Sequence, residues 1–394
     1  MPVHQMLIGI IGAPNKGKST LFSAITLHDV AIANYPFTTV DPNRGVAYAT
    51  APCPETELGL HCRARNSMCI NGVRMLPINI VDVAGLVEGA HEGRGMGNQF
   101  LNDLSTADAF LIVVDASGKT SSSGNPCDSC NPIDDVTMVK DELIEWVAGI
   151  ISSHMRVITH SANGLEALEN VLSGLKLRRG DIERAAAKRS LPLDKIGWDE
   201  DGIRAFSEEL LFSTKRVMVV ANKYDEPGAE RNFAELKKNL GEDVEWASAA
   251  IELALRKAAH QGVIAYEPGA TEFKLLKPDV SQEQRRALDY MAGFIKPGGT
   301  NVQNIINKAV FGLLDCIVVY PVEDEHKYTD HFGNVLPDAI LVRRGSTAQD
   351  LAAAIHTDLA QGMLYAIDAR TKMRLAKNYV LKNNDIIKIV STAK

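Results

Sequence analysis

A loop near the amino terminus has the residue types and spacing of a phosphate-binding site. Residues 12–19 have the sequence Gly-Ala-Pro-Asn-Lys-Gly-Lys-Ser, which matches the pattern G-x-x-x-x-G-K-[ST]. The loop follows an apolar run, residues 6–11, and leads into a predicted helix, as this motif requires. In such a loop, backbone N–H groups surround the phosphates, Lys18 contacts the β- and γ-phosphates, and Ser19 binds Mg²⁺. The pattern therefore predicts a nucleoside triphosphate site, against the alternative of a chance glycine turn.

Two later loops contain the carboxylates that such a site needs. Asp82 begins the sequence Asp-Val-Ala-Gly, in which the carboxylate can hold Mg²⁺ through water and the N–H group of Gly85 can contact the γ-phosphate. Residues 222–225 have the sequence Asn-Lys-Tyr-Asp, and the Asp225 carboxylate can accept two hydrogen bonds from the N–H donors of guanine, a donor pair that adenine lacks. Each pattern alone is common, and a simple turn is the alternative for residues 222–225. Their order along the chain favours a guanine nucleotide site.

Four apolar runs are predicted to form the strands that position these loops. Residues 6–11, 76–83, 109–114 and 216–221 are typical of parallel strands that helices cover on both faces. The three loops would then meet at the carboxyl edge of one sheet, where ligands of such folds bind. About 100 residues separate the third run from the fourth, and helical spacing of apolar residues predicts a mostly helical insertion over residues 119–214. The predicted fold class is α/β, a P-loop NTPase domain with a mostly parallel sheet.

The end of the chain is predicted to form a small α+β unit of its own. Residues 317–320 and 386–390 have strand patterns, and residues 347–360 have a helical pattern. Ser346 and Gln349 fit a capping box at the start of that helix. A second domain is therefore expected after the nucleotide-binding one.

Length and composition agree with a multidomain globular protein. The chain has 394 residues, 45% of them apolar and 23% charged. The predicted domains are residues 1–315, with the nucleotide site and the insertion, and residues 316–394. The sequence shows no signal-peptide pattern, and its apolar runs are much shorter than the roughly 20 residues of a membrane span. A cytoplasmic location without membrane contact is therefore expected.

The charge of the chain limits the ways in which it could bind nucleic acid. The net charge of −7 provides no general basic field. Residues 176–189 are locally basic, and they either contact RNA or form the solvated face of a helix. The charge pattern favours the solvated face.

Six cysteines, too few and too scattered for a disulfide framework, are expected to be reduced. Cys127 and Cys130 have the spacing of half a zinc site or a redox pair, but no second Cys-x-x-Cys exists. Cys53, Cys62 and Cys69 would complete such a site only if the loop before the second strand met the loop after the third. Unlinked loop thiols are therefore the expectation at Cys127 and Cys130, and a metal site is the alternative.

Three longer stretches resemble one family of GTPases. Residues 34–39 (Asn-Tyr-Pro-Phe-Thr-Thr), residues 82–95 and residues 98–101 (Asn-Gln-Phe-Leu) resemble the Obg and YchF branch of translation-factor-related GTPases, and its archaeal and eukaryotic-type YchF-related subgroup in particular. The resemblance implies that Thr39 closes over Mg²⁺ and that residues 316–394 form a TGS domain, a β-grasp module. YchF proper has lost the Asn-Lys-x-Asp pattern and prefers ATP, whereas this chain keeps it, which favours GTP.

Motifs and resemblance together define the candidate site. The Mg²⁺ ligands are Ser19, Thr39 and Asp82, and the resemblance adds Ser248 and Ala249 as backbone support for guanine. The full set of predicted nucleotide-binding residues is Gly12, Ala13, Pro14, Asn15, Lys16, Gly17, Lys18, Ser19, Thr20, Asn222, Lys223, Asp225, Ser248 and Ala249.

Hydrolysis is predicted to be slow. The resemblance places Leu86 where many GTPases have a glutamine that orients the attacking water. Water must then be ordered by another side chain, a monovalent cation or a partner. Asn15 matches an asparagine that helps bind K⁺ in potassium-activated relatives, with a loop cap as the alternative. Lys18, Thr39 and Gly85 are the predicted catalytic residues, and no general base is assigned.

The leading hypothesis is a GTPase switch that acts with the ribosome or the translation machinery. RNA contact through the insertion or the TGS-like domain is left open. The alternatives are a nucleotide-gated binding module with negligible hydrolysis, and an ATPase like YchF proper.

Overall fold

The computed structural model describes residues 6–27, 43–83, 85–89 and 103–392 of the chain. These residues form two compact units. The larger unit consists of the described residues within 7–27 and 80–305. The smaller unit consists of the described residues within 1–6, 28–79 and 306–394. No helix in the described part of the chain has the length and apolar character needed to cross a membrane.

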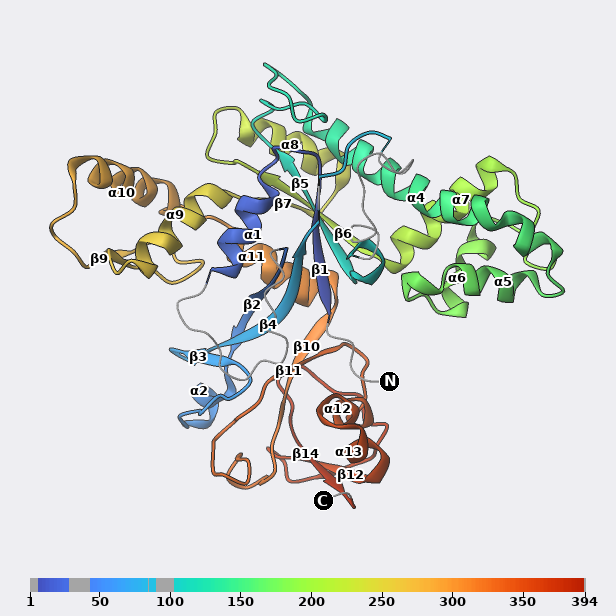
Figure 1. The fold of residues 1–394 in the computed structure, drawn as a ribbon. Coiled ribbons are helices and arrows are strands. Elements are labelled where there is room, and N and C mark those ends of the chain that lie inside the picture. The colour runs from blue at the N-terminus through green and yellow to red at the C-terminus, as the bar shows by residue number, and fades with distance from the viewer. Residues whose placement is uncertain (1–5, 28–42, 84, 90–102, 393–394) are drawn as a thin grey trace. The chain divides into compact units, whose positions relative to one another are not determined.

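A parallel sheet forms the centre of the larger unit (Figure 1). The full strand order of this sheet is β2-β4-β1-β5-β6-β7, with β3 paired to β4, and the pairs β1–β5, β5–β6 and β6–β7 are parallel. Strands β2 and β3 and the first part of β4 belong to the smaller unit. Every residue of β1 and β5 is buried, as the apolar runs predict. The strands are β1 (Leu7–Ile11), β4 (Val73–Asp82), β5 (Ala109–Asp115), β6 (Arg216–Asn222) and β7 (Val244–Trp246), with a short hairpin of β8 (Ile264–Ala265) and β9 (Lys274–Leu275).

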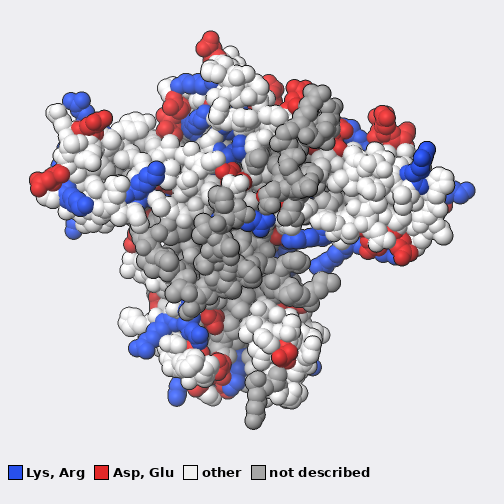
Figure 2. Space-filling view, in the orientation of Figure 1, with Lys and Arg blue, Asp and Glu red and all other residues white. Residues whose placement is uncertain are grey.

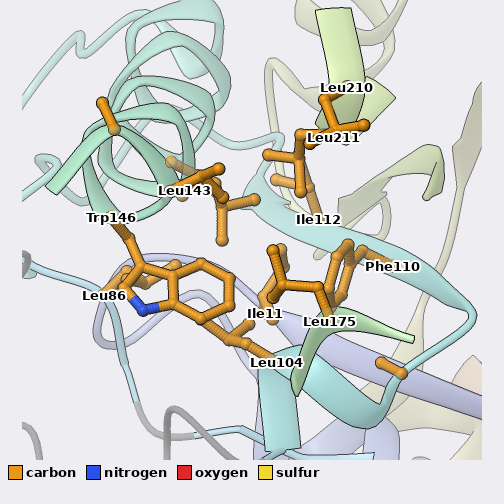
Figure 3. Packing of buried hydrophobic residues seen from close by; sticks show 14 of the residues in the cluster. Ile11, Leu86, Leu104, Phe110, Ile112, Leu143, Trp146, Leu175, Leu210 and Leu211 are labelled. Carbon is orange, nitrogen blue, oxygen red and sulfur yellow. The ribbon is translucent and has the colours of Figure 1, made fainter. Parts of the chain in front are cut away.

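Helices of the larger unit pack on this sheet and on one another. The predicted insertion is helical from residue 132 onward, and α4 packs against β5 while α7 packs against β6. Its helices share one apolar core with the sheet: Leu143 and Trp146 of α4 and Leu210 of α7 pack with strand residues (Figure 3). The helices are α1 (Lys18–Thr26), α4 (Pro132–His160), α5 (Gly164–Val171), α6 (Arg179–Lys188), α7 (Glu200–Thr214), α8 (Ala229–Leu240), α9 (Ala249–His260) and α10 (Gln282–Ile295), and α11 (Val302–Asn307) leads into the smaller unit.

The smaller unit contains a second, mixed sheet. Its strands lie in the order β11-β10-β14-β12-β13, with β10 and β14 parallel and the other pairs antiparallel. Helix α12 supplies Leu351 and Ala352 to the apolar core beneath. The elements are β2 (Arg44–Pro52), α2 (Pro54–Leu58), β3 (Met68–Ile70), β10 (Cys316–Pro321), β11 (Ile340–Arg343), α12 (Ala348–Ile355), α13 (Thr357–Gly362), β12 (Met363–Asp368), β13 (Arg374–Leu375) and β14 (Ile386–Ser391).

The predicted helix over residues 347–360 is two helices. His356 has an extended backbone, with φ −161° and ψ 142°, and its ring accepts a hydrogen bond from the Asp358 N–H group. One residue therefore ends α12 and caps α13. The predicted capping box at Ser346 and Gln349 was wrong by one residue, because Thr347 is the N-cap and pairs with Asp350.

The expectation of unlinked thiols at Cys127 and Cys130 was wrong, because a disulfide joins the two residues. The N–H groups of Cys127 and Cys130 donate to the carbonyl oxygens of Lys119 and Gly118, at 3.0 and 2.9 Å. These bonds fold the loop back on itself and hold the two Cα atoms 6.1 Å apart, within the range that a disulfide spans. The other cysteines, Cys53, Cys62, Cys69 and Cys316, form no disulfide.

Candidate nucleotide site

The phosphate loop joins β1 to α1 in a backbone conformation that requires glycine at two positions. Gly12 has φ +146°, and a Cβ atom there would lie 2.4 Å from the carbonyl oxygen of Val113. Gly17 has φ +88°, and a Cβ atom there would lie 2.3 Å from Nδ2 of Asn222. Any side chain at these positions would push the loop off the sheet edge. The two motif glycines therefore let the backbone approach the strands closely enough to form a phosphate cradle.

Lys18 and Asp82 lie together at the start of α1. The ammonium group of Lys18 is buried and donates to the carbonyl oxygen of Ala13 at 2.8 Å. Burial lowers the pKa of Lys18, and the nearby Asp82 carboxylate partly offsets this. A cation held inside the loop in this way suits an anionic ligand such as a triphosphate.

The Asp82 carboxylate has the environment of a ligand-binding group. Its Oδ1 atom is buried without a hydrogen-bond partner, and Ser19 hydrogen-bonds to the carboxylate. Burial raises the pKa of Asp82, while Ser19 and Lys18 oppose the rise. A carboxylate and a hydroxyl beside a phosphate loop are the oxygen donors that Mg²⁺ prefers. Ser19 and Asp82 therefore fit a Mg²⁺ ion, and Thr39, the third predicted ligand, lies outside the described residues.

Asn222 connects the phosphate loop to the end of the sheet. Its Nδ2 atom donates to the carbonyl oxygen of Lys16 at 3.0 Å, and its Oδ1 atom accepts the Ala249 N–H group at 3.2 Å. The first of these bonds joins residues 206 positions apart in the sequence. The first and third predicted motifs thus meet at one sheet edge.

The predicted guanine loop, residues 222–225, ends in a carboxylate with one unpartnered oxygen. The Oδ1 atom of Asp225 is buried and has no hydrogen-bond partner, and the same holds for Oγ of Ser248. Tyr224 holds the loop, because its ring packs 4.6 Å from the Trp246 ring and its N–H group donates to Ala247. A buried acceptor without a donor is costly unless a ligand supplies one.

Ser248 and Ala249 lie beside Asn222, at the start of α9. The N–H group of Ser248 donates to the Thr300 carbonyl oxygen at 3.2 Å, and that of Ala249 donates to Asn222. Both backbone donors are thus engaged within the protein. The Ser248 hydroxyl is the group that remains for a ligand.

Asp115 is a site residue that the motifs did not predict. It is the last residue of β5 and pairs in register with Asn222 of β6. Its Oδ2 atom forms an ion pair with Nζ of Lys223, at 2.8 Å. Burial alone would raise the pKa of Asp115, but hydrogen bonds from Lys223, Ser117 and Thr120 outweigh it and lower the pKa. The carboxylate therefore stays charged and fixes the Lys223 side chain. The sequence signal that could have identified Asp115 is its position directly after the apolar run of residues 109–114.

Two residues of the phosphate motif interact with the region after β5. The Lys16 side chain is fully buried and forms a 2.8 Å ion pair with Asp135, so only its backbone can reach a ligand. The Asn15 Nδ2 atom donates to the carbonyl oxygen of Gly124 at 2.9 Å. Residues of the insertion thus fix two residues of the phosphate loop through side-chain contacts.

Leu86, at the position where a glutamine would orient water, belongs to the hydrophobic core. It is 1% exposed, and its N–H group donates to the Gly12 carbonyl oxygen at 3.1 Å. Figure 3 shows its side chain beside Trp146 and Leu104. Gly85 is exposed, close to the Lys18 ammonium group. His91 and Arg94 lie outside the described residues.

The basic segment at residues 176–189 is largely paired with acidic side chains. Arg184 forms an ion pair with Asp181, and Lys188 and Arg189 form ion pairs with Glu209. Figure 2 shows Lys and Arg next to Asp and Glu over these helices. This arrangement agrees with the interpretation of a solvated helix face.

Three family models match the chain. The model for a 50S ribosome-binding GTPase matches residues 7–152, and the G4 motif-containing domain of the Obg-like GTPase YGR210-like group matches residues 220–324. The model for the TGS domain matches residues 332–391, the region of the second sheet.

Similar proteins cover nearly the whole chain. A GTP-binding protein of Methanocaldococcus jannaschii is 48% identical, over 98% of this chain and 100% of that protein. The crystal structure of a GTP-binding protein from Pyrococcus horikoshii superimposes with a TM-score of 0.77 at 38% identity, over 98% of this chain and 100% of that one. The ribosome-binding ATPase YchF of Haemophilus influenzae is 28% identical, over 91% of this chain and 86% of that protein.

Proposed function

Because the chain belongs to the Obg-like, YchF-related family of P-loop GTPases, we propose that it binds GTP with Mg²⁺ and hydrolyses it to GDP and phosphate. The observation that carries the proposal is the buried, unpartnered Oδ1 atom of Asp225. Asn222 ties the loop of Asp225 to the phosphate loop. One nucleotide can therefore bind to Lys18 through its phosphates and to Asp225 through its base.

The described residues have distinct roles in this proposal. Backbone N–H groups of the phosphate loop and Lys18 bind the β- and γ-phosphates, and the Gly85 N–H group contacts the γ-phosphate. Ser19 and Asp82, with Thr39, hold Mg²⁺, which neutralises charge on the phosphates when bound. Lys223, fixed by its ion pair with Asp115, would lie beside the base.

Intrinsic turnover is proposed to be slow because Leu86 is buried and carries no polar group. Asn15 donates through Nδ2, so its Oδ1 atom can accept K⁺ near the phosphates. The test is single-turnover hydrolysis of GTP in KCl and in NaCl, with and without ribosomes. Faster cleavage in KCl or with ribosomes is expected. If GTP is not cleaved under any of these conditions, the protein is a nucleotide-gated binding module and not a GTPase.

ATP is the second candidate substrate, because the similar YchF of Haemophilus influenzae is named an ATPase. Competition binding separates the two bases. We expect ATP to displace labelled GDP at least about 100-fold less well than GTP, because adenine lacks the donors that Asp225 accepts. Equal displacement would contradict the guanine assignment.

The cellular proposal is a cytoplasmic switch that acts with the ribosome. It is supported by the name of that same relative, a ribosome-binding protein, and by the match to the TGS domain. Sedimentation of the GTP-loaded and GDP-loaded protein with ribosomes tests it. Binding that depends on the nucleotide is expected.

A further inference from the structure

Three free cysteines and a glutamate converge in the smaller unit, which holds none of the described nucleotide-site residues. The ligand atoms of Cys53, Glu55, Cys62 and Cys69 all lie within 4.8 Å of one another. Cys53 is buried, and the other three are partly exposed, so a metal ion has access to the cluster. The disulfide-linked Cys127 and Cys130 belong to the larger unit and take no part.

The local fold positions all four side chains. Asn71 and Gly72 both have positive φ, which forms the tight turn between β3, where Cys69 lies, and β4. The N–H group of Cys53, the N-cap of α2, donates to the carbonyl oxygen of Gly72 at 2.8 Å. This bond places the end of β2 against the hairpin.

Glu55 joins the remaining two cysteines. Its Oε2 atom accepts the Cys62 N–H group at 2.7 Å, and its Oε1 atom lies 3.1 Å from Sγ of Cys69. The carboxylate is therefore held with one oxygen facing the thiols. Gly59, with φ +64°, ends α2 and turns the chain toward Cys62.

A buried cation, Arg74, lies beside the cluster. Arg74 is fully buried, pairs with Cys69 across the hairpin, and has Nη2 3.8 Å from Sγ of Cys53. Its other contacts are the Ser67 hydroxyl, the Leu336 carbonyl oxygen and the Tyr320 ring. Among the described residues, no carboxylate lies within ion-pair distance of this guanidinium.

The charge of Arg74 therefore has no direct ion-pair partner among the described residues, although the Glu55 and Asp338 carboxylates interact with it electrostatically. A buried charge is costly unless it is compensated. Protonated thiols add nothing to this compensation, because they are neutral. Thiolates bound to a metal ion can add to it, since three thiolates and a carboxylate around a divalent ion leave a net negative charge. A bound metal ion would thus explain both why the four ligand side chains converge and why a buried arginine lies beside them.

We propose that Cys53, Cys62, Cys69 and Glu55 bind one Zn²⁺ ion. Three sulfur ligands and one oxygen suit zinc rather than Mg²⁺ or Ca²⁺. With Zn–S bonds of about 2.3 Å, sulfur ligands of a tetrahedral site lie about 3.8 Å apart. The ligand atoms of the cluster, all within 4.8 Å of one another, therefore need only small shifts to bind the ion. A closed set of four protein ligands is typical of a structural site.

The zinc would fix a loop that contacts the TGS-like region of the same unit. The N–H groups of Arg63 and Arg65 donate to the carbonyl oxygens of Val335 and Pro337, at 2.8 and 2.7 Å. Cys62 and Cys69 flank this loop. Loss of the metal should therefore destabilise the smaller unit and leave GTP affinity nearly unchanged.

The test is the zinc content of the full chain, purified without a histidine tag or chelator, reduced with a phosphine and dialysed. We expect one zinc per chain in the wild type and less than about 0.1 per chain in Cys62→Ser/Cys69→Ser, because thiolates supply most of the affinity. Cys316→Ser, which removes a buried cysteine of the same unit, and Cys127→Ser/Cys130→Ser should both retain one zinc. A wild type with less than about 0.1 zinc after incubation with ZnCl₂ would overturn the proposal, and so would loss of zinc in either control.

Cobalt substitution keeps the proposal testable if the double variant does not fold. Co²⁺ added to the apo wild type should give the sulfur-to-cobalt charge-transfer band and the strong visible bands of a tetrahedral thiolate site. Glu55→Gln should bind the ion about 10- to 100-fold more weakly, on the scale seen for groups around a metal. Absence of the charge-transfer band, or a disulfide among Cys53, Cys62 and Cys69 in the freshly purified protein, would contradict the zinc site.

Discussion

Two polar regions of the larger unit differ in what their side chains contact. At the sheet edge, Oδ1 of Asp82 and Oδ1 of Asp225 are buried without a partner. In the basic segment at residues 176–189, Arg184, Lys188 and Arg189 have acidic partners. Charged residues mark both regions in the sequence.

The difference separates the two regions by the polar groups that they leave available. A buried polar atom without a partner lowers the stability of the free protein, so the two carboxylates at the sheet edge fit the proposed nucleotide site. An exposed ion pair contributes at most about 1 kcal/mol and leaves little charge for another molecule. Substitutions in the two regions should therefore differ strongly in their effect on nucleotide binding.

Lys18→Ala is expected to have the largest effect. In the proposed complex the ammonium group makes charge-assisted hydrogen bonds to two phosphates, each contributing about 1.5–3 kcal/mol, so GTP affinity should fall by a factor of about 10² to 10⁴. Titration with a fluorescent guanine nucleotide measures this. Lys119→Ala, which removes an exposed lysine paired with Glu226, is the control and should bind normally. Equal affinities for the two variants would contradict the phosphate-loop assignment.

Asp225→Asn should change the choice of base more than the overall affinity. An amide presents a donor where the carboxylate accepts, so the ratio of GTP to ATP affinity should fall by about 100-fold. Competition binding with both nucleotides measures this ratio. Glu226→Gln changes a neighbouring carboxylate, which pairs with Lys119, and should leave the ratio unchanged. An unaltered preference in Asp225→Asn would mean that guanine is recognised elsewhere.

Asp115→Asn should have an intermediate effect, because Asp115 acts through Lys223. Loss of the 2.8 Å ion pair should weaken GTP binding about 10-fold and lower the free energy of unfolding by about 1–3 kcal/mol. The exposed Asp243→Asn, near the start of β7, is a matched control with little expected effect.

The stability difference between wild type and Asp115→Asn should depend on pH. Hydrogen bonds to the carboxylate hold its folded pKa below the unfolded value of about 3.9. Its contribution to stability is therefore complete above about pH 4 and is lost as the pH falls through the folded pKa. Urea unfolding of both proteins, repeated at intervals of roughly one pH unit between pH 3 and pH 8, measures this difference in the free energy of unfolding. A difference that grows toward acid pH would contradict this role.

Local patterns were sufficient to predict the four strands β1, β4, β5 and β6, which position the candidate loops. The apolar runs at residues 109–114 and 216–221 correspond to β5 and β6, because a strand buried on both faces has to be apolar throughout. The match to the phosphate-loop motif likewise depends on neighbouring residues, with its two glycines required by contacts at Val113 and Asn222.

Features that depend on tertiary contacts were not predictable in this way. The anchoring of Lys223 by Asp115 depends on the register of β5 with β6. The capture of the Lys16 side chain by Asp135 depends on how the insertion packs. The cysteine cluster requires a hairpin turn at Asn71 and Gly72 that no cysteine spacing indicates. Thr39 lies outside the described residues and stays a prediction.

Arg189→Ala should have the smallest effect of the four substitutions. Arg189 is 35% exposed and pairs with Glu208 and Glu209, and such a pair contributes at most about 1 kcal/mol. GTP affinity should be unchanged, and affinity for a single-stranded RNA should change less than about 2-fold, because the positive charge is already compensated. Filter binding at low salt measures the RNA affinity. A much larger loss of RNA binding, with thermal stability unchanged, would assign the basic segment to a nucleic-acid contact and remove the contrast between the two regions.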